Sequence, residues 1–203
     1  IYNIDLVSMK NEEYVIKRNG EKECISFDKI LTRVKKLGGN DLSVNYTALV
    51  QKIIDRLYDE IPTTKIDELT AQQCASLITT HGDYGELDSR ILVSNHHKNT
   101  PKTFHATMSK LYHFTDINGE QHPLISEELW SIVNTNKDEL ELMIHYDRDY
   151  LIDYFGFKTL ERAYLMRVNK KIVERPQHMW LRVALGIWGN NFSKVKKTYD
   201  GMS

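Results

Sequence analysis

The chain has few cysteines and no long apolar run. Its 203 residues include only Cys24 and Cys74, which excludes a Cys-x-x-Cys pair and a four-cysteine zinc ribbon and gives no disulfide framework. No apolar run approaches the roughly 20 residues that a membrane-spanning helix needs. The opening residues lack the basic and apolar regions of a signal peptide. We therefore expect a cytoplasmic protein in a reducing compartment, without a membrane partner.

An excess of charge of one sign is also absent. The net charge is −1, with 27% charged and 41% hydrophobic residues, which is typical of a globular protein. Because nucleic-acid binding depends on clustered positive charge, this balance disfavours a nucleic-acid partner.

The motifs of catalysis and metal binding are missing too. The eight histidines include an adjacent pair, His96 and His97, which on a helix point about 100° apart and do not easily share one ion. The other histidines lack the spacing of a zinc protease helix, and no phosphate loop, nucleophile elbow or dinucleotide fingerprint occurs. We expect a binding site, with no catalytic residue and no metal ligand.

Residues 14–29 form the most informative segment. Val15 and Ile16 predict a strand, Asn19-Gly20 predicts a tight turn, and residues 24–27 predict a returning strand. Asp28 stands where the N-cap of a helix over residues 29–37 belongs. This arrangement places three cations near the free backbone N–H groups of a helix start, which suits a polyphosphate. Alternatively, these cations (Lys17, Arg18 and Lys29) are solvated surface residues beside an ordinary hairpin.

Helical patterns follow the hairpin. Gly38-Gly39 ends the first helix, and Asn45 caps a second that Pro62 breaks. Thr64 or Asp67 caps a third, a fourth covers residues 84–98, and helix resumes to about residue 112. We thus predict a polar lead-in at residues 1–13 and a short hairpin on a four-helix bundle at 14–112.

The second half, residues 113–203, begins with a polar linker at 115–122 and is also helical. Patterns recur at 126–135, 137–145, 158–168 and 178–187, with an aromatic turn at 154–157 and a further turn at 169–171. The predicted fold class is mainly α.

Several motifs resemble a known family. Residues 15–20 and 27–30 resemble the start of an ATP-cone, the nucleotide-sensing domain of many ribonucleotide reductase large subunits, and residues 93–98 resemble its last helix. Residues 154–162 and 174–179 are similar to the segments that lead into the catalytic barrel of class I reductases of the eukaryotic and viral type. The resemblance covers about residues 14–203, and the two long motifs are its most specific part.

The resemblance implies a set of site residues. Lys17 and Arg18 would contact the phosphates or ribose, Lys29 and Lys98 the phosphates, and Thr64 and Asp67 the base and sugar. The loop at 62–66 is about one residue shorter than in the family, which leaves Thr63 and Thr64 as alternatives. Thr64 and Asp67 could instead be plain helix caps, and Lys98 a solvated charge. The site would be lined by the segment from Glu23 to Lys29, namely Glu23, Cys24, Ile25, Ser26, Phe27, Asp28 and Lys29.

The resemblance also implies a function. ATP, with Mg²⁺, would activate and dATP would inhibit the reduction of ribonucleoside diphosphates, by changing how large subunits assemble with each other and with the radical-generating small subunit. No cysteine matches the radical site or the redox pair, so the chain by itself would be inactive. Two alternatives remain: an ATP-cone transcriptional repressor, which needs a zinc ribbon, and a degenerate viral homologue that acts as an interaction module.

Overall fold

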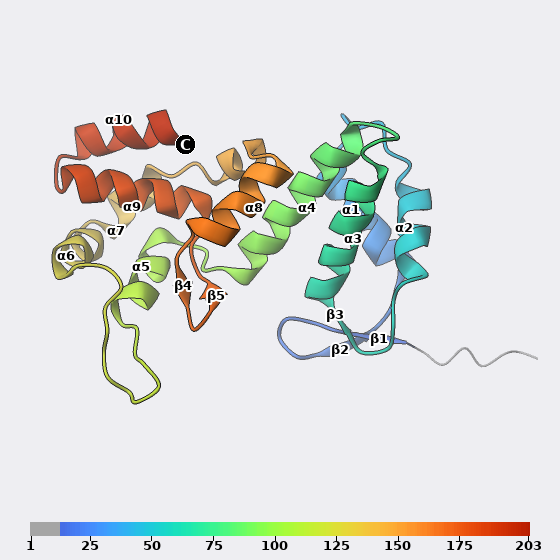
Figure 1. The fold of residues 1–203 in the computed structure, drawn as a ribbon, viewed down its shortest axis with the longest axis horizontal. Coiled ribbons are helices and arrows are strands. Elements are labelled where there is room, and N and C mark those ends of the chain that lie inside the picture. The colour runs from blue at the N-terminus through green and yellow to red at the C-terminus, as the bar shows by residue number, and fades with distance from the viewer. Residues whose placement is uncertain (1–12) are drawn as a thin grey trace, which may run out of the picture. The chain divides into compact units, whose positions relative to one another are not determined.

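The computed structural model describes residues 13–203, so the predicted lead-in at 1–13 falls outside it except for its last residue. The chain divides into two compact units, of which the first ends at Ile91 and the second runs from Leu92 to Ser203. Helix α4 (Asp83–Asn99) contributes residues to both, so the division falls inside a continuous helix (Figure 1). The domain limits predicted from the sequence, with a boundary after residue 112, stay a prediction.

A small sheet begins the first unit. Strands β1 (Tyr14–Ile16) and β2 (Lys22–Cys24) pair antiparallel, and β3 (Ile61–Pro62) joins β1 in parallel. Gly20 has φ 86°, which confirms the predicted Asn19-Gly20 turn. The predicted returning strand is present as β2, but its predicted bounds, 24–27, are wrong, because β2 ends at Cys24 and Ser26 already caps the next helix. Strand β3 has no counterpart in the sequence prediction, since two residues carry no periodicity.

The helices of the first unit are α1 (Phe27–Gly38), α2 (Tyr46–Ile54), α3 (Thr63–Leu77) and α4. Their apolar faces enclose one core, to which α2 contributes the fully buried Leu49, Val50 and Ile53. The hairpin and the four predicted helices are confirmed, except that α2 ends at Ile54, before the predicted break at Pro62. Asn45 is confirmed as a cap, since its Oδ1 accepts from the Ala48 N–H at 3.0 Å.

Two predicted caps are wrong. The Ser26 Oγ, not Asp28, accepts from the Lys29 N–H at 3.3 Å, so Asp28 lies in the first turn of α1. Helix α3 begins at Thr63, directly after Pro62, and has no side-chain cap. Thr64 therefore lies inside the helix, and Asp67 is buried one turn further along, where its carboxylate is held by cations instead of backbone N–H groups.

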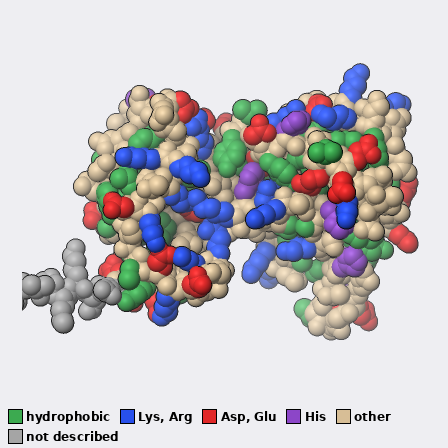
Figure 2. Space-filling model, turned by 180° about the vertical axis from the view of Figure 1, so that it is seen from behind, with side chains coloured by type: hydrophobic (Ala, Val, Ile, Leu, Met, Phe, Trp, Pro, Cys, Tyr) green, Lys and Arg blue, Asp and Glu red, His purple; other side chains and the backbone are tan. Residues whose placement is uncertain are grey.

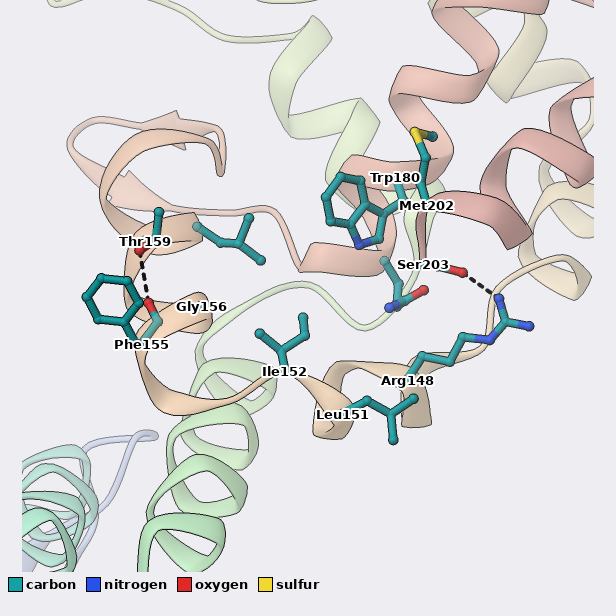
Figure 3. A pocket seen from close by; sticks show the side chains of 11 residues that line it. Arg148, Leu151, Ile152, Phe155, Gly156, Thr159, Trp180, Met202 and Ser203 are labelled. Carbon is teal, nitrogen blue, oxygen red and sulfur yellow. Dashed lines mark hydrogen bonds between the residues drawn. The ribbon is translucent and has the colours of Figure 1, made fainter. Parts of the chain in front are cut away.

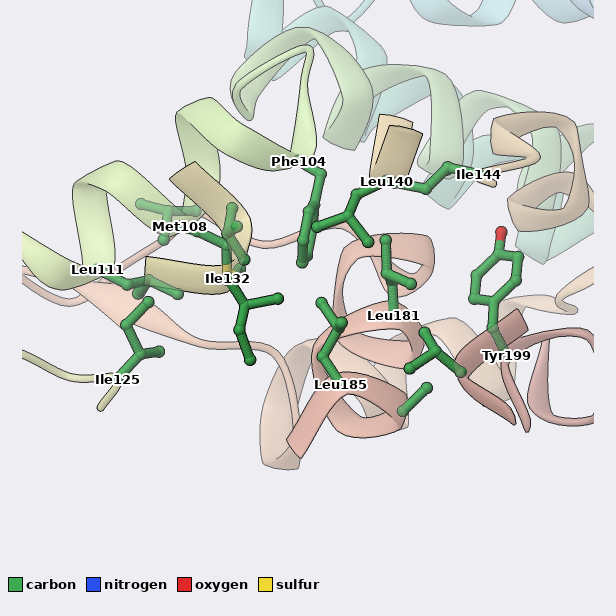
Figure 4. Packing of buried hydrophobic residues seen from close by; sticks show 14 residues of the cluster. Phe104, Met108, Leu111, Ile125, Ile132, Leu140, Ile144, Leu181, Leu185 and Tyr199 are labelled. Atoms are coloured by element: carbon green, nitrogen blue, oxygen red, sulfur yellow. The ribbon is translucent and has the colours of Figure 1, made fainter. Parts of the chain in front are cut away.

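The second unit is helical apart from a two-stranded hairpin. Its core is formed by residues such as Phe104, Met108, Leu140, Leu181 and Tyr199 (Figure 4). The elements that follow α4 are α5 (Phe104–Tyr112), α6 (Glu127–Thr135), α7 (Lys137–Leu142), the 3₁₀ helix η1 (Tyr146–Leu151), α8 (Tyr154–Ala163), β4 (Arg167–Val168), β5 (Lys171–Ile172), α9 (Pro176–Trp188) and α10 (Phe192–Met202).

Two predictions for this unit, the aromatic turn at 154–157 and the helix over 158–168, are wrong in their bounds. Residues 154–157 form the first turn of α8, not an aromatic turn before a helix, because the Asp153 carboxylate caps the Gly156 N–H at 2.7 Å. The helix then ends at Ala163, earlier than the predicted residue 168, because residues 167–172 form the β4–β5 hairpin. Asn169 and Lys170, both with positive φ, make the turn predicted there.

Candidate functional site

The hairpin and the start of α1 bring two predicted lysines onto one carboxylate. Glu23, on β2, forms ion pairs with Lys17 from the end of β1 and with Lys29 from the first turn of α1. The side chain of Glu23 is 22% exposed, whereas those of Lys17 and Lys29 are 44% and 69% exposed. Both ammonium groups therefore remain accessible to a ligand, and Figure 2 shows Lys and Arg side chains gathered on one face of the first unit.

A second cluster surrounds Asp67. The Asp67 carboxylate is 6% exposed and accepts from Arg33 Nε at 2.7 Å and from Arg33 Nη2 at 3.0 Å. Arg18 Nη2 lies 3.3 Å from the same carboxylate, and Arg18 Nη1 donates to Thr63 Oγ1 at 3.5 Å. Two arginines thus neutralise one buried carboxylate.

Helix α1 borders, along most of its length, an open depression of about 350 Å³. It is lined along one face of the helix by Asp28, Lys29, Thr32, Arg33 and Lys36. Three of these five residues are cationic, and the backbone N–H groups at a helix start add positive potential. The depression can therefore accept an anion.

Arg33 was not predicted as a site residue. It lies four residues after Lys29, and with Lys36 it forms a cationic stripe opposite the apolar face of α1. This spacing was a usable signal, but the sequence does not reveal that Asp67 faces the stripe.

The remaining predicted residues occupy different surroundings. Ser26 caps α1, whereas Ile25 and Phe27 pack against the core of the first unit. Cys24 is exposed on β2, next to Glu23. Thr63, not Thr64, contacts the arginine cluster; within residues 13–203 no hydrogen bond joins the Thr64 side chain to a predicted site residue. Lys98 is exposed and belongs to the second unit.

The second unit contains a separate apolar hollow of about 490 Å³ (Figure 3). Leu151, Ile152, Phe155, Trp180 and Met202 provide most of its surface, and none of the predicted site residues lines it. Figure 3 also shows the hydrogen bond between Arg148 and Ser203 at its edge.

The described residues also contain one group with metal-ligand chemistry. Asp116, Glu120 and His122 offer ligand atoms within 4.8 Å of one another on an exposed loop. The Asp116 carboxylate already accepts from the backbone N–H groups of Asn118 and Glu120, which lower its pKa. We therefore assign this group a role in shaping the loop. Over residues 13–203, no helix is both long and apolar enough to cross a membrane.

Two protein-family models match different parts of the chain. Residues 13–99 match the family described as "ATP cone domain". Residues 150–203 match "Ribonucleotide reductase, all-alpha domain".

Whole-chain relatives agree with both matches. The ribonucleoside-diphosphate reductase large subunit of Caenorhabditis elegans is 46% identical over 95% of this chain and 25% of its own length. The large chain 2 of the same enzyme from Saccharomyces cerevisiae is 45% identical over 94% of this chain and 22% of its own. The ribonucleoside-diphosphate reductase large subunit from Variola virus is 44% identical over 94% of this chain and 25% of its own length. The chain thus spans about a quarter of the length of the curated relatives it matches.

Proposed function

Because the chain belongs to the ribonucleoside-diphosphate reductase large-subunit family, with an ATP-cone and an all-alpha region, we propose that it is the regulatory nucleotide-binding part of such a subunit. ATP and dATP are its effectors. The reduction of ribonucleoside diphosphates belongs to the longer protein.

The observation that carries the proposal is the sharing of Glu23 by Lys17 and Lys29 beside the start of α1. A triphosphate offers more negative charge and more acceptor oxygens than one carboxylate, so it competes with Glu23 for both lysines. The N–H groups of the first turn of α1 add favourable potential for the same anion. The lysines therefore release Glu23 and hold the phosphates.

The arginine cluster supplies the other end of the proposed site. Arg18 is shared between Asp67 and Thr63, so it connects the hairpin to the start of α3. We assign the base and ribose to the side of Thr63 and Asp67, where the Thr63 hydroxyl donates to a ring nitrogen and the Asp67 carboxylate accepts from a sugar hydroxyl. The roles that the family resemblance implies for Thr64 and Lys98 stay predictions. Mg²⁺ is bound through the phosphate oxygens.

Regulation follows from a difference between two effectors in one pocket. ATP and dATP differ by one hydroxyl group, so they must stabilise different assemblies of large subunits, or of large and radical-generating small subunits, through unequal contacts in those states. Cys24 is exposed and Cys74 is buried, and we assign neither of them to the reduction of ribonucleotides. A cytoplasmic location accords with two free thiols.

Isothermal titration calorimetry of the chain with ATP and with dATP tests this function. In the Lys29→Glu variant the carboxylate at N3 can form a capping box with Ser26, so the helix is preserved. We expect this variant to weaken ATP binding about tenfold or more, or about 1.4 kcal/mol. The matched control is Lys35→Glu, on the same helix and outside the depression, and should change the affinity less than about twofold. Equal affinities for both variants, or no heat with either nucleotide, would contradict the proposal.

A further inference from the structure

The second unit contains a polar cavity that the nucleotide proposal does not use. It has a volume of about 690 Å³, within the range of about 300–1,000 Å³ that is typical of small-molecule sites. Helix α5 and the segment after it form one wall, and the β4–β5 hairpin forms the other. The lining consists of Ser109, Lys110, His113, Phe114, Thr115, Val168, Asn169, Lys171 and Val173.

The charged side chains that line this cavity have one sign. No acidic residue lines it, and neither Lys110 nor Lys171 forms an ion pair with any residue of the described chain. Within the lining, the charge of the two lysines is therefore not neutralised by a carboxylate.

The turn of the β4–β5 hairpin contains two residues with positive φ. Asn169 and Lys170 have φ values of 49° and 66°, which lie in the left-handed region. Asn accepts this conformation readily, whereas Lys stands at a turn position that favours Gly. A cation thus occupies the tip of the hairpin at a conformational cost, and Asn169, the other residue of the turn, lines the cavity.

Uncharged donors complete the lining. Ser109 and Thr115 contribute hydroxyl groups, and Asn169 contributes an amide. His113 Nδ1 lies 3.0 Å from the Ser109 carbonyl oxygen and donates to it, which fixes the orientation of the ring. The His113 ring also meets Trp130 edge to face, with centroids 5.2 Å apart, which holds the ring in place.

From these observations we propose that the cavity between α5 and the β4–β5 hairpin binds the phosphate group of a small phosphorylated molecule. Lys110 and Lys171 supply the charge, and the hydroxyl and amide groups orient the phosphate oxygens. This site lies wholly in the second unit and does not depend on nucleotide binding by the hairpin of the first.

Titration of the full 203-residue chain with pyrophosphate, at constant ionic strength, tests the proposal. The readout is the NMR signal of the His113 imidazole, assigned with a His113→Gln variant, because this signal reports the cavity and not the first unit. We expect a saturable shift at millimolar pyrophosphate. The Lys110→Glu/Lys171→Glu double variant should weaken binding by about tenfold or more.

The control carries the same change of charge on the same unit. Lys102 and Lys137 are exposed and lie outside the cavity, and Lys102→Glu/Lys137→Glu should change the affinity less than about twofold. If the double variant melts early, Lys110→Met/Lys171→Gln replaces it, with a smaller but measurable loss expected. Absence of a saturable His113 shift, or an equal loss in the control, would overturn the proposal.

Discussion

Arg33 holds Asp67 with two hydrogen bonds, from Nε to Oδ1 at 2.7 Å and from Nη2 to Oδ2 at 3.0 Å. The two residues are 34 positions apart and join α1 to α3. Arg18 adds the end of β1 to the same carboxylate. One buried acid therefore fixes three elements that border the proposed nucleotide site.

Loss of the Asp67 charge should destabilise the first unit. In Asp67→Asn, two partly buried guanidinium groups lose their counter-charge, and we expect the free energy of unfolding to fall by about 1–3 kcal/mol. Urea denaturation measures this change. Glu68→Gln is the control, because Glu68 is exposed and pairs only with Lys65 among the described residues, so less than about 0.5 kcal/mol is expected. Equal effects would show that the cluster has no structural role.

The two thiols should react very differently. Burial raises the pKa of the Cys74 thiol to about 12, and the nearby Asp88 carboxylate adds to this increase, so the thiolate is scarce at neutral pH. Cys24 is exposed. A thiol reagent should therefore label one cysteine in the folded chain and the second only after unfolding.

The control is the unfolded chain, in which both cysteines should react at similar rates. Rapid labelling of Cys74 in the folded state would contradict its burial.

The second unit should lose stability in acid through His178. This ring is fully buried, with Nδ1 3.0 Å from Thr107 Oγ1 and Nε2 2.9 Å from Tyr146 OH. Burial first, and then the positive charge of Arg175, lower its pKa well below 6.5. The unfolded chain therefore takes up a proton at a pH where the folded chain does not. Stability should fall as the pH drops below about 6.5, by up to about 1.4 kcal/mol per pH unit.

Denaturation of the chain between pH 7 and pH 5 measures this slope. His178→Asn removes the titrating group and should flatten the dependence even if it lowers stability at every pH, because the comparison uses the slope and not the absolute value. An unchanged slope would mean that other groups cause the loss in acid.

Ser26 and Asp28, at the start of α1, should contribute unequally to stability. Ser26→Ala removes the acceptor for the Lys29 N–H and should cost about 1 kcal/mol of stability. Asp28→Ala removes only a favourable charge in the first turn and should cost about 0.5 kcal/mol. Thermal denaturation ranks the two variants, and the reverse order would restore Asp28 as the cap.

The sequence predicts the helices well because their apolar residues repeat with the period of a helix. Leu49, Val50 and Ile53 recur with helical spacing on one face of α2, and all three are buried. The turn at Asn19-Gly20 was predictable for a local reason, since Gly20 accepts positive φ without strain. Helices and turns that are determined by neighbouring residues in the sequence were therefore predictable.

Features that depend on distant partners were not found. In the sequence, Asp67 is a residue type that often caps helices and it stands near a predicted helix start. Only the fold reveals that Arg18 and Arg33 donate to its carboxylate. Ser26 and Asp28 are both good caps, and the choice between them depends on where β2 ends. The lysines of the site were predicted from the family resemblance, whereas their common partner Glu23 was expected only as part of the lining.

A crystal structure of the chain with ATP tests the central claim most directly. The account predicts phosphate oxygens within hydrogen-bond distance of the Lys17 and Lys29 ammonium groups, with the Glu23 carboxylate displaced from at least one of them. A nucleotide bound elsewhere, or phosphates that leave both Glu23 ion pairs intact, would contradict it.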